Sequence, residues 1–271
     1  MIARELDMRA FAMAITQGMA LYAQNTRNFT EAARLYKYLA DIAIEYGDGK
    51  REGMAYHQQG NVAYLQGDYP VAKQFYKQAL EKRLEINDEA GLSKTYHQIG
   101  MLAHNSGEFA AAMDFYEKSL EIKLRINDEE GAAVTYHQMG NLSCLTEDYG
   151  AAEKYYTEAL NLSLKLKIAM YIASNYHQLG LVVQKRKDFV GAKAHYIESL
   201  SISLKNNDEY NAANTYIELG NVSAWNNEDE SAREYYREAI KIYLKFGDAY
   251  NAELAKANLL RVDTIDDTLM E

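Results

Sequence analysis

The feature that most constrains the fold of this chain is a five-residue pattern that returns every forty residues without insertion. It reads Tyr-His-Gln-x-Gly, starts at residues 56, 96, 136 and 176, and returns in altered form at residue 216. A constant period of this length is typical of a solenoid, in which one supersecondary unit is stacked on copies of itself. The pattern therefore predicts a repeat protein rather than one or two globular domains.

Helices are the secondary structure that this composition favours. The 271 residues include only one proline and 16 glycines, so little in the chain interrupts a helix. Two apolar-periodic segments fill each forty-residue repeat, for example about 50–67 and 69–87. We expect an all-α protein with two helices per repeat.

Short turns are predicted at the joints between these helices. Between repeats, pairs such as Asn87-Asp88 and Asn127-Asp128 place a residue that tolerates a left-handed backbone before an acid that caps the next helix. One joint, at residues 165–168, contains neither Gly, Asn nor Asp. Either packing alone stabilises a turn there, or the stacking is locally distorted.

Five positions in each repeat resemble the tetratricopeptide repeat family. In the middle repeat they are Tyr136, Gly140, Ala152, Tyr156 and Ala159. The period of 40 is longer than the family's usual period of about 34. In this longer period the chain is similar to the variants in kinesin light chains and Leu-Gly-Asn repeat proteins. The resemblance implies a right-handed superhelical solenoid of antiparallel helix pairs, with about 13 helices in all.

The resemblance covers nearly the whole chain and divides it into repeats. We expect one solenoid over residues 1–261, with Ala20 at the glycine position of the first repeat. A short acidic segment containing Asp263, Asp266 and Asp267 is expected to be a disordered tail over residues 262–271. The expected repeats are 8–48, 49–88, 89–128, 129–168, 169–208 and 209–248, followed by a capping helix at 249–261.

Charge and composition exclude several classes of function. The formal net charge of −10 disfavours nucleic acid and anionic membrane surfaces as partners. No apolar segment is long enough to cross a membrane, no signal peptide is recognisable, and Cys144 is the single cysteine. We expect a cytoplasmic protein without a disulfide.

Helical spacing divides the repeated pattern into two faces. Tyr136, Met139 and Gly140 lie on the face that packs against the second helix of the repeat, whereas His137 and Asn141 lie away from it. The face that carries His137 and Asn141 is similar to the face that, in tetratricopeptide folds, lines a concave groove where peptides bind. The predicted partner-binding residues are His57, Gln58, Asn61, His97, Gln98, Met101, His137, Gln138, Asn141, His177, Gln178, Asn221 and Trp225.

The repeated histidines have three possible roles. They can be spacers that bond a neighbouring side chain and stabilise the stacking of repeats, they can contact a ligand, or they can sense pH near neutrality. Trp225, the sole tryptophan, is either an aromatic anchor at the end of the groove or a residue that packs on the terminal helix. The sequence leaves these alternatives open.

The predicted function is non-enzymatic binding of a protein or peptide segment. An uncharged groove of amides and imidazoles suits an extended peptide backbone, and it lacks the Lys and Arg that the family's chaperone-binding clamp requires. We find no phosphate-binding loop, no catalytic constellation, no metal site and no need for a cofactor. The alternative is the ligand-sensing region of a larger bacterial signalling or nucleotide-switch protein.

Overall fold

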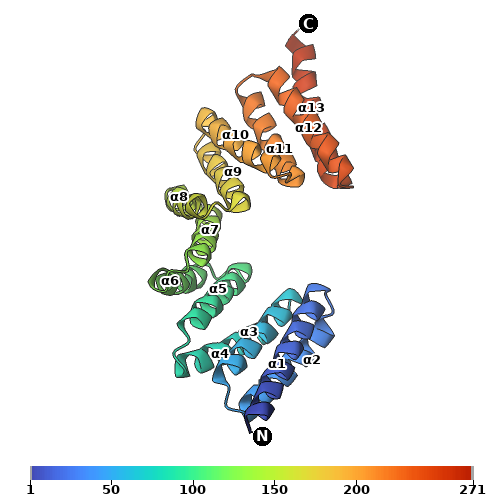
Figure 1. The fold of residues 1–271 in the computed structure, drawn as a ribbon. Coiled ribbons are helices and arrows are strands. Elements are labelled where there is room, and N and C mark those ends of the chain that lie inside the picture. Colours follow the sequence, from blue (N-terminus) through green and yellow to red (C-terminus); the bar gives the residue numbers. More distant parts are fainter. Residues whose placement is uncertain (1, 270–271) are drawn as a thin grey trace. The chain divides into compact units, whose positions relative to one another are not determined.

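The structure of the chain, a computed structural model, describes residues 2–269, with the side chains of residue 8 and residues 10–264. Within these residues the fold is helical throughout, without a strand, as the all-α prediction requires (Figure 1). The helices of the described chain are α1 Ile2–Asn25, α2 Phe29–Glu45, α3 Gly49–Leu65, α4 Tyr69–Glu85, α5 Glu89–Asn105, α6 Phe109–Arg125, α7 Glu129–Leu145, α8 Tyr149–Leu166, α9 Ala169–Lys185, α10 Phe189–Lys205, α11 Glu209–Trp225, α12 Asp229–Lys245 and α13 Ala249–Leu269.

A left-handed residue ends each helix up to α12, and these residues are spaced twenty apart. Glycine or asparagine occupies most of the joints, including Gly67, Asn87 and Asn127, as the turn signals predict. The residue that follows is usually an aspartate whose side chain accepts from the backbone N–H three residues later, as Asp88 does from Gly91 at 3.0 Å. Backbone geometry therefore repeats every twenty residues, although the sequence pattern repeats every forty.

The joint without a turn signal forms the same turn as the others. Lys167 adopts φ 57° and ψ 37°, and its N–H bonds back to the carbonyl of Leu164. The next N–H, that of Ile168, bonds to the carbonyl of Ser163 at 3.1 Å, although Ile168 provides no side-chain cap. Of the two alternatives, the regular turn is present, and backbone hydrogen bonds hold it at the cost of a left-handed lysine.

A glycine on the first helix and a tyrosine on the second helix hold each full repeat together. A Cβ built on Gly60 would lie 2.5 Å from the ring of Tyr76, and Gly140 and Tyr156 have the same relationship at 2.6 Å. The tyrosine rings of these pairs are fully buried. The prediction that small residues admit bulky tyrosines between paired helices is therefore confirmed.

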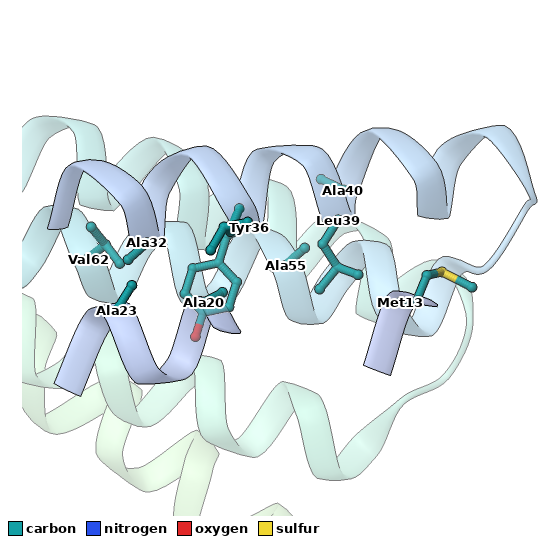
Figure 2. Close-up of a cluster of buried hydrophobic side chains, with 10 residues drawn as sticks. Met13, Ala20, Ala23, Ala32, Tyr36, Leu39, Ala40, Ala55 and Val62 are labelled. Atoms are coloured by element: carbon teal, nitrogen blue, oxygen red, sulfur yellow. The ribbon is translucent and has the colours of Figure 1, made fainter. Parts of the chain in front are cut away.

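The first repeat carries alanine where the others carry glycine. Figure 2 shows the ring of Tyr36 reaching from α2 toward Ala20 of α1, beside Ala23 and Ala32. Met13, Leu39 and Val62 extend this buried cluster. An alanine at this position is compatible with the helix pair, and Ala20 is fully buried.

The chain divides into two compact halves, Met1–Gly131 and Ala132–Glu271. Within the first half, α1 to α5 pack on one another in sequence order, and within the second half α8 to α13 do the same. Each half therefore contains stacked helix pairs of the predicted kind. One continuous solenoid over residues 1–261 remains a prediction.

The final helix extends beyond its expected end. α13 continues to Leu269, so the disordered tail predicted to begin at residue 262 is wrong for residues 262–269, and residues 270 and 271 lie outside the described chain. Neither Gly nor Pro follows Arg261 to end the helix. Val262 is buried, and Asp263 accepts a hydrogen bond of 2.9 Å from Nε of Arg233 on α12.

Candidate functional site

The repeated histidines lie between the first helices of neighbouring repeats. Nδ1 of His57 is 3.2 Å from Oγ1 of Thr95, and Nδ1 of His177 is 3.2 Å from Oγ1 of Thr215. Each partner stands 38 positions later in the chain, on the next first helix. His137 has the same arrangement, 2.8 Å from Oδ1 of Asn175. These contacts are those expected of a spacer that joins one repeat to the next.

Burial disfavours the charged form of these histidines and so lowers their pKa. His57 and His97 are each only 8% exposed, and each ring lies against a buried tyrosine ring. Desolvation lowers the pKa of both rings to about 3. It also lowers the pKa of His137 and His177, which are slightly more accessible. A histidine that senses pH near neutrality needs an environment that keeps its pKa close to neutral pH.

The asparagines on the first helices bond the core tyrosines. The hydroxyl of Tyr76 donates to Oδ1 of Asn61 at 2.9 Å, and Nδ2 of Asn61 donates to Oε1 of Gln58 at 2.7 Å. Asn141 repeats the arrangement with Tyr156 and Gln138, and Asn221 with Tyr236 and Glu218. The predicted amides therefore form short chains that run from the core to a half-exposed side chain.

Three repeats lack this asparagine, and their tyrosines behave differently. Leu21 replaces it in the first repeat, where the hydroxyl of Tyr36 is buried without a hydrogen-bond partner. Met101 replaces it in one repeat, where the buried hydroxyl of Tyr116 has no hydrogen-bond partner. Leu181 replaces it in another, where the hydroxyl of Tyr196 donates instead to Oε1 of Gln184 at 2.5 Å. The asparagine is thus one of two ways in which the chain satisfies a buried phenol.

Trp225 is the most exposed of the predicted residues, with 53% of its surface accessible. Its ring lies 5.1 Å from that of Phe189, at the start of α10, and this is the ring contact that the structure gives it. The choice between an aromatic anchor and packing on the terminal helix therefore stays open. Gln58, Gln98, Gln138 and Gln178 are half-buried, as is Met101.

A cavity of about 480 Å³ brings four of the predicted residues together in the second half. His137 and Gln138 of α7 and His177 and Gln178 of α9 contribute to its wall. The remaining wall includes side chains that the sequence did not single out, among them Asn175, Ser199, Ser203, Asn214 and Thr215. In the sequence these residues are small polar side chains at helical positions that are expected to be buried. The repeat pattern alone does not distinguish such positions from ordinary core positions.

The described residues offer little for other chemistry. No group of three His, Cys, Asp or Glu side chains in this part of the chain is placed to hold a metal ion. Cys144 is half-buried, its Sγ accepts from the Tyr156 hydroxyl at 3.8 Å, and burial raises the pKa of the thiol. A thiol with a raised pKa is a poor nucleophile at neutral pH. No helix among the described residues combines the length and apolarity needed to cross a membrane.

Comparison with known proteins decides the family. A model of the tetratricopeptide repeat matches residues 12–85, 91–165 and 171–245, which together make up most of the chain. The chain belongs to the tetratricopeptide repeat family. The predicted resemblance is confirmed, and repeats of this family generally mediate protein–protein interaction. A search of curated protein sequences finds no significant match.

Solved structures with this fold support the same assignment. BtubC (BKLC) from P. vanneervenii is 23% identical, with a TM-score of 0.73 over 83% of this chain and 93% of that one. Tetratricopeptide-like repeats of a putative kinesin light chain from P. anserina are 14% identical, with a TM-score of 0.60 over 71% of this chain and 95% of that one. The predicted similarity to kinesin light chain repeats is therefore confirmed at the level of the fold.

A third structure is a longer protein. It is a signal transduction ATPase with numerous domains that carries a tetratricopeptide repeat sensor, from Pyrococcus horikoshii. It is 19% identical, with a TM-score of 0.84 over 93% of this chain. The present chain spans 38% of that protein's length.

Proposed function

We propose that the chain is a cytoplasmic, non-enzymatic module that binds a peptide or an extended protein segment across its first helices. The observation that carries the proposal is the cavity of about 480 Å³, whose wall includes His137, Gln138, His177 and Gln178. Concave sites that combine apolar walls with a few convergent polar groups are the usual places for ligands.

The chemistry of this face suits a peptide backbone. Gln138 and Gln178 are half-buried amides that can both donate and accept, and neither carries a charge that must be neutralised. The net charge of −10 argues against nucleic acid as the partner. A peptide held through its main chain, with selected side chains in the cavity, agrees with both properties.

The test is selection of peptides from a displayed random library on the full chain, followed by affinity measurements on a matched pair of variants. Gln138→Ala combined with Gln178→Ala changes the proposed face. Glu158→Ala combined with Glu198→Ala changes two exposed residues, forty positions apart, on second helices. The proposal expects the first double variant to weaken binding of the selected peptides about tenfold or more, and the second to bind as the wild type does. Equal binding by both variants would contradict it.

A second candidate function is a sensor region within a larger signalling protein. The observation in its favour is the TM-score of 0.84 to a protein whose tetratricopeptide repeats are a sensor. The full length of the natural chain separates the two candidates. An attached nucleotide-binding domain would favour the sensor, and a chain of the present length would favour the free module.

A further inference from the structure

One buried position on the second helices differs in side-chain size among the repeats. It is Arg83 on α4 and Lys123 on α6, each 4% exposed, but Ser163 on α8 and Ser203 on α10, each at most 2% exposed. The first and last repeats carry Ala43 and Tyr243 at this position, and both are buried. The volume that a long cation occupies in the repeats of Arg83 and Lys123 is therefore open to another group in the repeats of Ser163 and Ser203.

Arg83 shows what a cation does at this position. Its Nη1 donates to the carbonyl of Gly91 at 2.6 Å and to Oγ1 of Thr95, and its Nε lies 3.7 Å from the carboxylate of Asp88. All three partners belong to the start of the next first helix, α5, or to its cap. The guanidinium thus bridges one repeat to the next from inside the core.

Hydrogen-bond accounting at Thr95 shows that its hydroxyl is fully used. Thr95 Oγ1 donates its single proton to the carbonyl of Gly91 at 3.2 Å. Its two lone pairs then face two neighbours, Nδ1 of His57 and Nη1 of Arg83. His57 therefore faces one lone pair of the Thr95 hydroxyl, and Arg83 faces the other.

Thr215 is the equivalent residue in the second half, and one of its lone pairs is left over. Its Oγ1 donates to the carbonyl of Asn211 at 3.0 Å and lies 3.2 Å from Nδ1 of His177. Ser199 is 3.4 Å away but gives its own proton to the carbonyl of Ala173 at 2.8 Å. Ser203, in the place of Arg83, is too short to supply the missing donor.

Ser203 itself is unsatisfied. Its Oγ is buried without a hydrogen-bond partner, and the residue is 2% exposed. Ser203 and Thr215 both line the cavity of about 480 Å³. A buried hydroxyl without a partner costs free energy that a bound donor would recover.

The wall of this cavity contains no charged side chain, so no cation repels a positive ligand group and any negative charge must come from outside the wall. A smaller cavity of about 160 Å³ shares His177 and Asn214 with it and includes the carboxylate-bearing Glu218. Glu218 is the single acid at a position where four repeats carry glutamine and the first repeat carries Gly18. Asp208 caps α11 as Asp88 caps α5.

We propose that this cavity binds the guanidinium of an arginine side chain in the bound peptide, in the place that Arg83 fills within the first half. The proposal rests on the proposed function and specifies one side chain of the ligand. The planar guanidinium supplies several donors to Thr215, Ser203 and neighbouring oxygens, while Glu218 provides the negative charge nearby. Burial lowers the pKa of His137 and His177, which disfavours the charged rings that would repel the guanidinium.

The experiment measures binding of small probes to the full chain by calorimetry or by NMR titration. The probes are N-acetyl-arginine methylamide and its citrulline analogue, which has nearly the same shape but no charge. We expect the arginine probe to bind at least about tenfold more tightly than the citrulline probe. Equal affinities, or no binding of the arginine probe, would overturn the proposal.

A matched pair of variants locates the site. Ser203→Arg supplies the chain's own arginine, which should occupy the cavity as Arg83 does, abolish probe binding and leave the melting temperature unchanged or higher. Glu198→Arg places an arginine on an exposed position of the same helix and should leave probe binding intact. Unchanged binding by Ser203→Arg would place the probe elsewhere and overturn the proposal. If this variant does not fold, the comparison of the two probes on the wild type still decides.

Failure of this inference is distinguishable from failure of the proposed function. One possible outcome is that the selected peptides lack arginine, bind the Gln138 and Gln178 double variant more weakly, and bind the Ser203→Arg variant normally. That outcome would contradict the cation site while leaving peptide binding in place. Absence of any selected peptide would count against the function, whereas the arginine probe would still report on the cavity.

Discussion

The hydroxyl of Tyr76 donates a hydrogen bond of 2.9 Å to Oδ1 of Asn61, across the two helices of one repeat. In the following repeat Tyr116 is just as buried, but Met101 stands where the asparagine would be, and the phenol has no partner. The same core therefore contains a satisfied tyrosine and an unsatisfied one. The comparison isolates the contribution of a single buried hydrogen bond.

Met101→Asn should stabilise the protein. The new amide can accept from the Tyr116 hydroxyl, which recovers about 1 kcal/mol of unfolding free energy. The measurement is the midpoint of urea denaturation followed by circular dichroism. Asn61→Met is the matched reverse change and should lower stability by about 1–3 kcal/mol, because it leaves the Tyr76 hydroxyl buried and unpaired. A destabilised Met101→Asn variant would show that the methionine contributes more by packing.

The buried histidines predict a loss of stability as the pH falls. The pKa of His57 and His97 is lowered to about 3 in the folded chain, against an ordinary value of about 6.5 when unfolded. The unfolded chain therefore binds protons first, so stability is complete above about pH 6.5 and decreases toward pH 3 by up to about 1.4 kcal/mol per pH unit for each ring.

The melting temperature between pH 7.5 and 5 measures this effect, in a window above the titration of most carboxylates. We expect the double variant His57→Gln with His97→Gln to show a flatter pH profile, whatever its stability at pH 7.5. A profile as steep as that of the wild type would assign the effect to other groups. His104→Gln, which changes a more accessible ring, is the control.

Lys167→Gly should raise stability. Lys167 has a left-handed backbone with φ 57°, a conformation that costs a non-glycine residue about 1 kcal/mol. Glycine is already present at the equivalent joints Gly47 and Gly247. Lys165→Gly, two residues earlier in the last turn of α8, should instead lower the free energy of unfolding by about 0.5–1 kcal/mol, as measured by urea denaturation. Equal effects of the two substitutions would mean that strain at residue 167 is negligible.

Gly140→Ala should lower stability, because the new methyl group would lie 2.6 Å from the ring of Tyr156, which is fully buried and cannot move freely. Overpacking of this kind costs about 1–3 kcal/mol. Gly150→Ala is the matched control at the start of α8, where the nearest atom to the new Cβ is 3.5 Å away. Thermal melts of the two variants should differ in direction or by several degrees.

The sequence predicted the fold because its strongest signals are local. Gly140 and Tyr156 lie in one helical hairpin, and Asn87 and Asp88 are adjacent, so spacing along the chain is enough to interpret them. Lys167 shows the limit of turn signals, since backbone hydrogen bonds can hold a left-handed lysine without any. The capping helix was predicted to end too early because Val262 and Asp263 find partners on other helices.

The candidate site was harder to predict because it depends on contacts between repeats. The spacing predicted that the histidines lie away from the second helix of their repeat, but the ring of His57 lies 5.8 Å from that of Tyr76 on α4. The Nδ1 of His57 also meets Thr95 on the next first helix, 38 residues later. Spacing within one helix cannot show whether such a residue faces solvent or a neighbouring repeat. A comparison of Arg83 with Ser203 would have indicated the cavity, but only once the buried orientation of that position was known.

The even placement of the left-handed residues has a consequence for how such a gene can change. Since the backbone turn recurs every twenty residues and the side-chain pattern every forty, unequal recombination between two repeats removes or adds a whole helical hairpin at once. The hairpins on either side of the junction then meet surfaces of the same geometry as before. Arrays of this type are thereby free to gain or lose length in evolution while each remaining repeat keeps its own core.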